Sequence, residues 1–183
     1  MAEYTIAVLV GSLRKESINR RLARALEKLA AGRARFDFVE IGDLPLYNQD
    51  FDADYPAQGK RLKQQIRGAD AVLFVTPEYN RSVPAPLKNA IDVGSRPYGQ
   101  SAWSGKPGAI ISVSPGAIGG FGANHHLRQS LVFLDVPCMQ QPEAYLGGAG
   151  SVFDDAGQVS EKTKPFLQAF IDAYGQWVEK QKG

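Results

Sequence analysis

Residues 4–20 read YTIAVLVGSLRKESINR, and this stretch decides the fold. Its first part, Tyr4–Val10, is rich in Ile and Val, which predicts a buried strand. Apolar residues at helical spacing start near Ser17 and predict a helix over residues 17–31. Hydroxyls, a guanidinium and a carboxamide lie where this helix begins, and unpaired N–H groups and the helix dipole favour an anion there. The stretch therefore predicts a strand–loop–helix unit that binds a phosphate, with Arg14 adding a charge-assisted contact.

The same alternation of strand and helix continues along the chain. Further strands are expected at Phe36–Ile41, Asp70–Thr76, Gly108–Ser114 and Val136–Gln140, and further helices at Gly59–Gly68, Pro84–Val93, Asn124–Leu134 and Thr163–Val178. The continuous apolar runs in 70–76 and 108–114 are typical of parallel strands that are covered on both faces. The pattern predicts an α/β fold, a flavodoxin-like three-layer sandwich with a five-stranded parallel sheet of order 2-1-3-4-5. We expect one such domain over residues 1–183.

Composition excludes several classes of protein. The single cysteine, Cys138, excludes an internal disulfide, and no apolar run approaches the roughly 20 residues of a membrane span. The first residues lack the basic segment of a signal peptide, so we expect a cytoplasmic protein. Lys and Arg concentrate between residues 14 and 35, which indicates either a solvated helix face or a field that attracts anions. Because no aromatic or recognition-helix pattern accompanies them, we expect neither a nucleic acid nor a membrane as partner.

Three loops are expected to meet at the carboxyl edge of the predicted sheet, where ligands of such folds bind. The loop at 11–19 lacks the glycine patterns of dinucleotide and Walker A sites. The loop at 76–84 places Tyr79 and polar side chains on a backbone stiffened by prolines, which suits a heteroaromatic ring. The loop at 114–122 is rich in glycine, so its backbone can approach a ligand closely.

Taken together, these loops resemble one known family. Their patterns are Gly-Ser-Leu-Arg-x-x-Ser-x-Asn, Pro-Glu-Tyr-Asn-x-Ser-x-Pro and Ser-x-Gly-x-x-Gly-Gly, and they resemble those of the NADPH-dependent FMN reductases over about residues 4–150. The resemblance implies a flavodoxin-like fold with non-covalent FMN and with NADPH or NADH as electron donor. It also implies a small-molecule acceptor, namely a quinone, a flavin, an azo compound or chromate, and a homodimer or homotetramer.

The resemblance also implies the residues that would contact the cofactor. The FMN phosphate would be held by Ser12, Arg14, Ser17 and Asn19, with the backbone of Ile18 beside them. The isoalloxazine ring would be lined by Pro77, Glu78, Tyr79 and Asn80, and approached from the third loop by Ser114 and Gly116.

A flavin would carry the chemistry, so we expect no catalytic side chain and no metal. Hydride would pass from the nicotinamide to the flavin and then to an acceptor in the same slot, which predicts ping-pong kinetics. Backbone N–H groups of the glycine-rich loop could stabilise the reduced ring. The adjacent His125 and His126 point in different directions on a helix, so cap or surface roles are expected. Cys138 is expected to be a buried thiol.

Two other functions remain open at this point. One is a flavodoxin-like electron carrier without NAD(P)H activity, against which Arg14 and the net charge of +2 count, because flavodoxins are usually acidic and lack this arginine. The other is a flavin-free sensor of a phosphorylated metabolite. The loop aromatics Tyr98, Trp103 and Phe121 are expected to contribute to a subunit interface.

Overall fold

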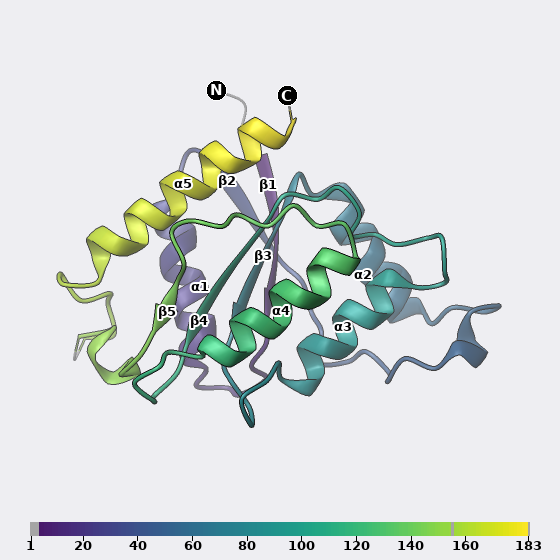
Figure 1. Ribbon diagram of the computed structural model, residues 1–183, viewed down its shortest axis with the longest axis horizontal. Coiled ribbons are helices and arrows are strands. Elements are labelled where there is room, and N and C mark those ends of the chain that lie inside the picture. Colours follow the sequence, from purple (N-terminus) through teal and green to yellow (C-terminus); the bar gives the residue numbers. More distant parts are fainter. Residues whose placement is uncertain (1–3, 155, 183) are drawn as a thin grey trace.

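A computed structural model describes residues 4–154 and 156–182 and shows one parallel sheet of order β2-β1-β3-β4-β5 (Figure 1). The strands are β1 (Tyr4–Val10), β2 (Ala34–Phe38), β3 (Ala71–Thr76), β4 (Gly108–Val113) and β5 (Tyr145–Leu146). The helices are α1 (Ile18–Leu29), α2 (Ala57–Gly68), α3 (Ala85–Ser95), α4 (Phe121–Phe133) and α5 (Lys164–Lys182), with short 3-10 turns at Gln49–Phe51 and Ala149–Ser151. The predicted α/β fold class, sheet direction and strand order are confirmed.

The register of the central strands brings three loops to one edge. Val10 of β1 pairs with Val75 of β3, and Thr76 pairs with Ser112 of β4, so the three strands end at about the same level. The loops that follow them gather along the lower edge of the view in Figure 1, whereas β1 begins and α5 ends near the upper edge. The convergence that places the candidate site therefore follows from parallel pairing alone.

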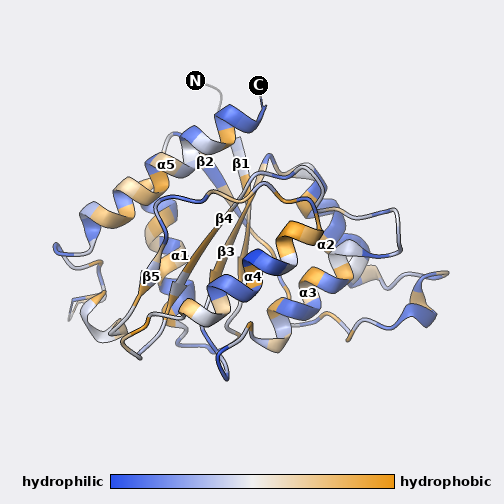
Figure 2. Cartoon of the chain, in the orientation of Figure 1, coloured by the Kyte–Doolittle hydropathy of each residue, from blue (hydrophilic) through white to orange (hydrophobic). Residues whose placement is uncertain are grey.

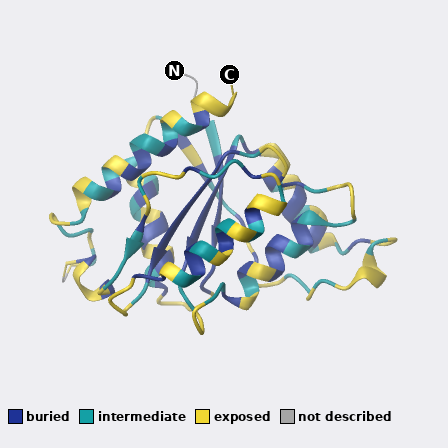
Figure 3. Ribbon diagram, in the orientation of Figure 1, coloured by how far each residue is buried: buried dark blue, intermediate teal, exposed yellow. Residues whose placement is uncertain are grey.

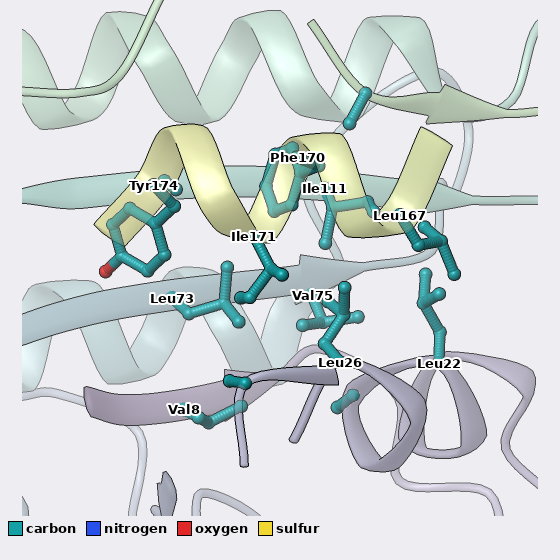
Figure 4. Close-up of a cluster of buried hydrophobic side chains, with 14 of the residues drawn as sticks. Val8, Leu22, Leu26, Leu73, Val75, Ile111, Leu167, Phe170, Ile171 and Tyr174 are labelled. Atoms are coloured by element: carbon teal, nitrogen blue, oxygen red, sulfur yellow. The ribbon is translucent and has the colours of Figure 1, made fainter. Parts of the chain in front are cut away.

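Two hydrophobic cores lie on opposite faces of the sheet, because successive strand residues point to alternate sides. On one face, α1 and α5 cover the sheet, and Figure 4 shows Leu26 of α1 beside Val75 of β3, and Phe170 of α5 beside Ile111 of β4. On the other face, α2, α3 and α4 cover it, with Phe74 of β3 facing them. Figures 2 and 3 show the result: the central strands are apolar and buried, while polar, exposed residues lie on the outer helix faces and in the loops.

Two large aromatic residues fasten loops and helices to these cores. The Tyr174 hydroxyl of α5 is fully buried and donates a hydrogen bond to the Val72 carbonyl at 2.6 Å. Burial raises the pKa of Tyr174 well above its usual value, so the hydroxyl stays protonated and remains a donor. Trp103 is also fully buried and donates from Nε1 to the Ile91 carbonyl at 2.9 Å. The expectation that Trp103 contributes to a subunit interface is therefore wrong, because its loop folds back against Phe74 in the core.

The fifth strand lies later in the sequence than predicted. Val136–Gln140 forms only a single bridge, between Cys138 and Gly108, while the strand that pairs with β4 is Tyr145–Leu146. Pro137 has no N–H to give to a ladder, which explains why the earlier segment does not extend the sheet. Cys138 is only partly buried, but burial still raises the pKa of its thiol to about 11.

Other boundaries shift by a few residues. Strand β2 begins and ends earlier than predicted, at Ala34–Phe38. Helix α4 begins at Phe121 rather than Asn124, because the chain leaves the positive-φ backbone of Gly120 directly into the helix. Within the described ranges, no helix combines the length and the hydropathy that crossing a membrane requires.

Candidate functional site

The first loop alternates exposed residues with buried polar ones. Ser12, Ser17 and Asn19 are almost completely buried, while Arg14 is exposed at the loop surface. Ser17 is the N-cap of α1, and its Oγ accepts a hydrogen bond from the Arg20 N–H at 3.2 Å. The capping role explains part of this sequence, but the Ser17 hydroxyl hydrogen stays available to a ligand.

The side chain of Asn19 indicates that this loop also forms a binding site for a ligand. Its Oδ1 atom is buried and has no hydrogen-bond partner among the described residues. A buried polar atom without a partner costs roughly 1–3 kcal/mol, so it is usually satisfied by a ligand, an ion or a water. The carboxamide offers an N–H donor to a phosphate oxygen and a carbonyl acceptor to a hydroxyl, which fits a phosphorylated polyol chain such as that of FMN.

The first and second loops pack tightly against each other. A Cβ atom on Gly11 would lie 3.1 Å from Thr76 Oγ1 and 3.3 Å from Pro77 Cδ. The Thr76 hydroxyl donates to the Pro77 carbonyl at 2.7 Å. Glycine at position 11 therefore lets the end of β1 lie directly beside the end of β3, which brings the first two loops into one site.

The second loop forms a tight hairpin that presents Tyr79. The N–H of Tyr79 donates to the Ser82 carbonyl at 3.1 Å, and the N–H of Ser82 donates to the Tyr79 carbonyl at 2.9 Å. The two residues between them, Asn80 and Arg81, have φ values of 51° and 63°. This left-handed backbone is common for Asn but costly for Arg, and such strain is typical of binding loops. The Tyr79 side chain is left 49% exposed, so its ring is available as a flat surface.

The Glu78 side chain does not point its carboxylate into open space. Its Oε2 accepts a hydrogen bond from the Ala123 N–H in the first turn of α4 at 3.1 Å, and its Oε1 accepts from Arg81 Nη1 at 3.1 Å. The side chain is only 8% exposed. The negative charge at a helix N-terminus is favourable, so Glu78 holds the second loop on α4. Toward a ligand, Glu78 offers its backbone rather than its carboxylate.

Replacing Glu78 by Ala should lower the free energy of unfolding by about 2 kcal/mol, because a buried charged acceptor is lost from the start of α4. Urea denaturation measures the change. The matched control is Glu27→Ala, which removes a more exposed partner of an Arg at the same spacing and should cost less than about 0.5 kcal/mol. Equal effects of the two substitutions would show that Glu78 does not hold the loop.

The third loop is closed by hydrogen bonds within itself. The Gly116 N–H donates to Ser114 Oγ at 3.3 Å, and the Gly116 carbonyl accepts from the Gly119 N–H at 3.2 Å and the Gly148 N–H at 3.3 Å. The Gly116 N–H already has an acceptor, so it is not among the free backbone N–H groups with which this loop could stabilise a reduced ring. Ser114 is half-buried and Gly116 is exposed, both beside the sheet edge.

Helix α4 links the second and third loops, a role that sequence reasoning missed. Nδ1 of His126 lies 2.9 Å from the Ser82 hydroxyl of the second loop. Nε2 of His125 lies 2.9 Å from the Tyr145 hydroxyl of β5, and the Phe121 ring stacks on His125 with centroids 4.2 Å apart. Burial and the nearby Glu143 carboxylate raise the pKa of Tyr145 to about 12. Ser82 lies 44 positions from His126 and Tyr145 lies 20 positions from His125, so no local pattern could reveal these two contacts.

The site thus contains a buried polar loop at a helix start, an exposed aromatic ring and a glycine-rich loop. Within the described residues, no group of three or more His, Cys, Asp or Glu side chains could hold a metal ion.

The model of the NADPH-dependent FMN reductase family matches residues 4–151, which include all three loops. The chain belongs to the NADPH-dependent FMN reductase family. As a member of this FMN reductase family, it is an oxidoreductase that depends on NAD(P)H and FMN.

Similar reductases and oxidoreductases match nearly the whole chain. A quinone reductase of Pseudomonas putida strain KT2440 is 69% identical over 177 residues, which are 96% of this chain and 95% of the relative. A 2-hydroxy-1,4-benzoquinone reductase of a Burkholderia species is 54% identical over 178 residues, or 97% of each chain. The solved structure of FerB, a flavoenzyme NAD(P)H:(acceptor) oxidoreductase from Paracoccus denitrificans, superposes with a TM-score of 0.92 at 50% identity, covering 97% of this chain and 98% of that one.

Proposed function

We propose that this reductase transfers electrons from NAD(P)H through bound FMN to a quinone, with ping-pong kinetics. The observation that carries the proposal is the buried Asn19 carboxamide at the start of α1, whose Oδ1 has no partner among the described residues, at the same sheet edge as the ends of β3 and β4. Quinones are favoured over flavins, azo compounds and chromate because two of the similar proteins bear quinone reductase names.

We assign the cofactor contacts as the sequence predicts them. Ser12, Arg14, Ser17, Asn19 and the Ile18 backbone hold the phosphate at the positive end of α1. Pro77, Tyr79, Asn80 and the Glu78 backbone would line the ring, and Ser114 and Gly116 would approach it from the third loop. When bound, FMN supplies the two-electron chemistry. The chain itself binds and orients the cofactor, and the exposed Tyr79 ring offers a flat surface to the flavin ring.

The chain is further proposed to form one FMN-binding domain over residues 1–183 that assembles into a homodimer or homotetramer. Several large apolar side chains are exposed on α4 and near it, which supports a self-association surface. Val132 is 77% exposed, Phe133 is 81% exposed, and Tyr98 in the loop after α3 is 86% exposed.

The first experiment is the visible spectrum of the purified protein with added FMN, followed by NADPH without oxygen. A flavin spectrum that bleaches and is restored by a quinone supports the proposal, and parallel double-reciprocal plots support the ping-pong order. Bound flavin that stays yellow with both NADPH and NADH would favour an electron carrier instead. A protein that binds no flavin would contradict both and leave the first loop as a phosphate site for another ligand.

A further inference from the structure

A basic groove runs along the outer side of α1, on the face that does not enter the core. It encloses about 570 Å³ between α1 and the segment that precedes α5. The cations along it are Lys15, Arg20, Arg21, Arg24, Lys28 and Lys164. Two carboxylates, Glu16 and Glu161, also line it, so positive charge dominates. The volume lies in the range of sites that hold small molecules, roughly 300–1,000 Å³.

Several of these cations have no charged partner within the described ranges. Arg24 is paired with Glu27 at 2.8 Å, and Lys164 lies 3.9 Å from Glu161. Arg20, Arg21 and Lys28 form no ion pair with any described carboxylate within 4.0 Å. Arg21 and Lys28 are seven positions apart, which is about two helical turns, so they project from the same side of α1.

The floor of the groove is apolar and includes an aromatic ring. Phe153 and Val159 line it from the segment before α5, and Leu29 lines it from α1. The guanidinium of Arg21 lies over the Phe153 ring, 4.3 Å from its centroid. An apolar floor with a stacked guanidinium, beneath a row of cations, fits a ligand that combines a planar ring with a phosphate. A purely inorganic anion would not need the apolar part.

The groove is continuous with the candidate cofactor site. Ser17 and Lys15 line its end, and both belong to the first loop, where we place the FMN phosphate. We propose that this groove binds the adenosine half of NADPH, with Arg21 and Lys28 contacting its 2′-phosphate. This inference rests on the proposed function, because that function supplies the ligand. It goes further by assigning a preference for NADPH over NADH to particular residues.

The test compares NADPH with NADH in the FMN-loaded enzyme, with a quinone as acceptor. In Arg21→Gln and in Lys28→Gln, we expect KM for NADPH to rise roughly tenfold, as for loss of one charge-assisted contact, while KM for NADH changes less than about twofold. Calorimetry of NADP⁺ and NAD⁺ binding should give the same selective loss. Lys60→Gln on α2 is the matched control, since its side chain is 63% exposed and distant from the groove, and it should change neither constant.

The outcomes separate this inference from the function on which it rests. An active reductase whose variants affect both coenzymes equally, or neither, would contradict the inference and leave the function intact. FMN loss from the variants would also overturn it, since the cations would then serve the flavin phosphate. The wild type could show no turnover while Lys28→Gln binds NADP⁺ more weakly and NAD⁺ unchanged. In that case the inference stands and the proposed function is wrong. Because Lys28 makes no stacking contact with Phe153, its variant tests the charge alone.

Discussion

Replacing Asn19 by Asp is expected to weaken FMN binding by roughly a thousandfold. The substitution keeps the size of the side chain, which is only 4% exposed, but places a negative charge where we expect the phosphate. Two like charges about 4 Å apart at an effective dielectric constant near 20 repel by about 4 kcal/mol, which is roughly three powers of ten in affinity. Titration of the apo-protein with FMN, followed by flavin fluorescence, measures the dissociation constant.

The folded chain should tolerate this change. Asn19 lies in the first turn of α1, where the helix dipole offsets part of the cost of burying a carboxylate, so the apo-protein should still fold but with a lower melting temperature. Asn89→Asp is the control, because Asn89 is also buried but lies on α3 and bonds to Tyr47 and Pro45. It should lower stability and leave FMN affinity unchanged. Unaltered FMN affinity in Asn19→Asp would place the phosphate elsewhere.

Replacing Gly119 by Ala is expected to destabilise the protein by about 3 kcal/mol and to disrupt the third loop. Gly119 has a φ of 63°, which costs roughly 1–2 kcal/mol for a residue with a side chain. Its Cβ would also lie 2.6 Å from the Tyr145 carbonyl carbon and 2.8 Å from the Gly147 nitrogen, so the backbone must move, at a cost of roughly 1–3 kcal/mol. Urea denaturation gives the stability, and flavin titration should show weaker FMN binding.

Gly116 provides the comparison within the same loop. A Cβ there would have only Ser114 Oγ nearby, at 3.8 Å, and its φ is not in the left-handed region. Gly116→Ala should therefore change stability by less than about 0.5 kcal/mol. Similar losses for the two variants would mean that the loop tolerates no side chain anywhere, and the argument from the close packing of Gly119 against β5 would fail.

Most of the fold could be predicted because its determinants are local. The apolar runs in β3 and β4 are bounded by polar segments, and the helices carry apolar residues at helical spacing, such as Leu22 and Leu26. The type of each element and the order of strands and helices could therefore be read along the chain. The fifth strand was misplaced for a reason that is not local. Val136–Gln140 has the composition of a strand, but Pro137 and its neighbours meet β4 only at Gly108, and the pairing passes to Tyr145.

The candidate site was partly predictable for the same reason. Parallel order brings the three loops to one edge, so their convergence follows once the order is known. The direction of individual side chains does not follow from order. The Glu78 carboxylate is held by α4, Trp103 turns into the core, and His126 contacts the second loop. Each depends on a partner more than ten positions away, which no sequence motif encodes. The assignment of residues to FMN stays a prediction.

The division of the core between the two sheet faces also has a consequence for synthesis of the chain. The core under α2, α3 and α4 is built from residues that have all been made once position 138 is reached. The opposite core needs α5, whose Leu167, Phe170 and Tyr174 come last from the ribosome. During translation, one face of the sheet can therefore close while the other still exposes its apolar side chains. The nascent protein should depend most on chaperones in the interval between these two events.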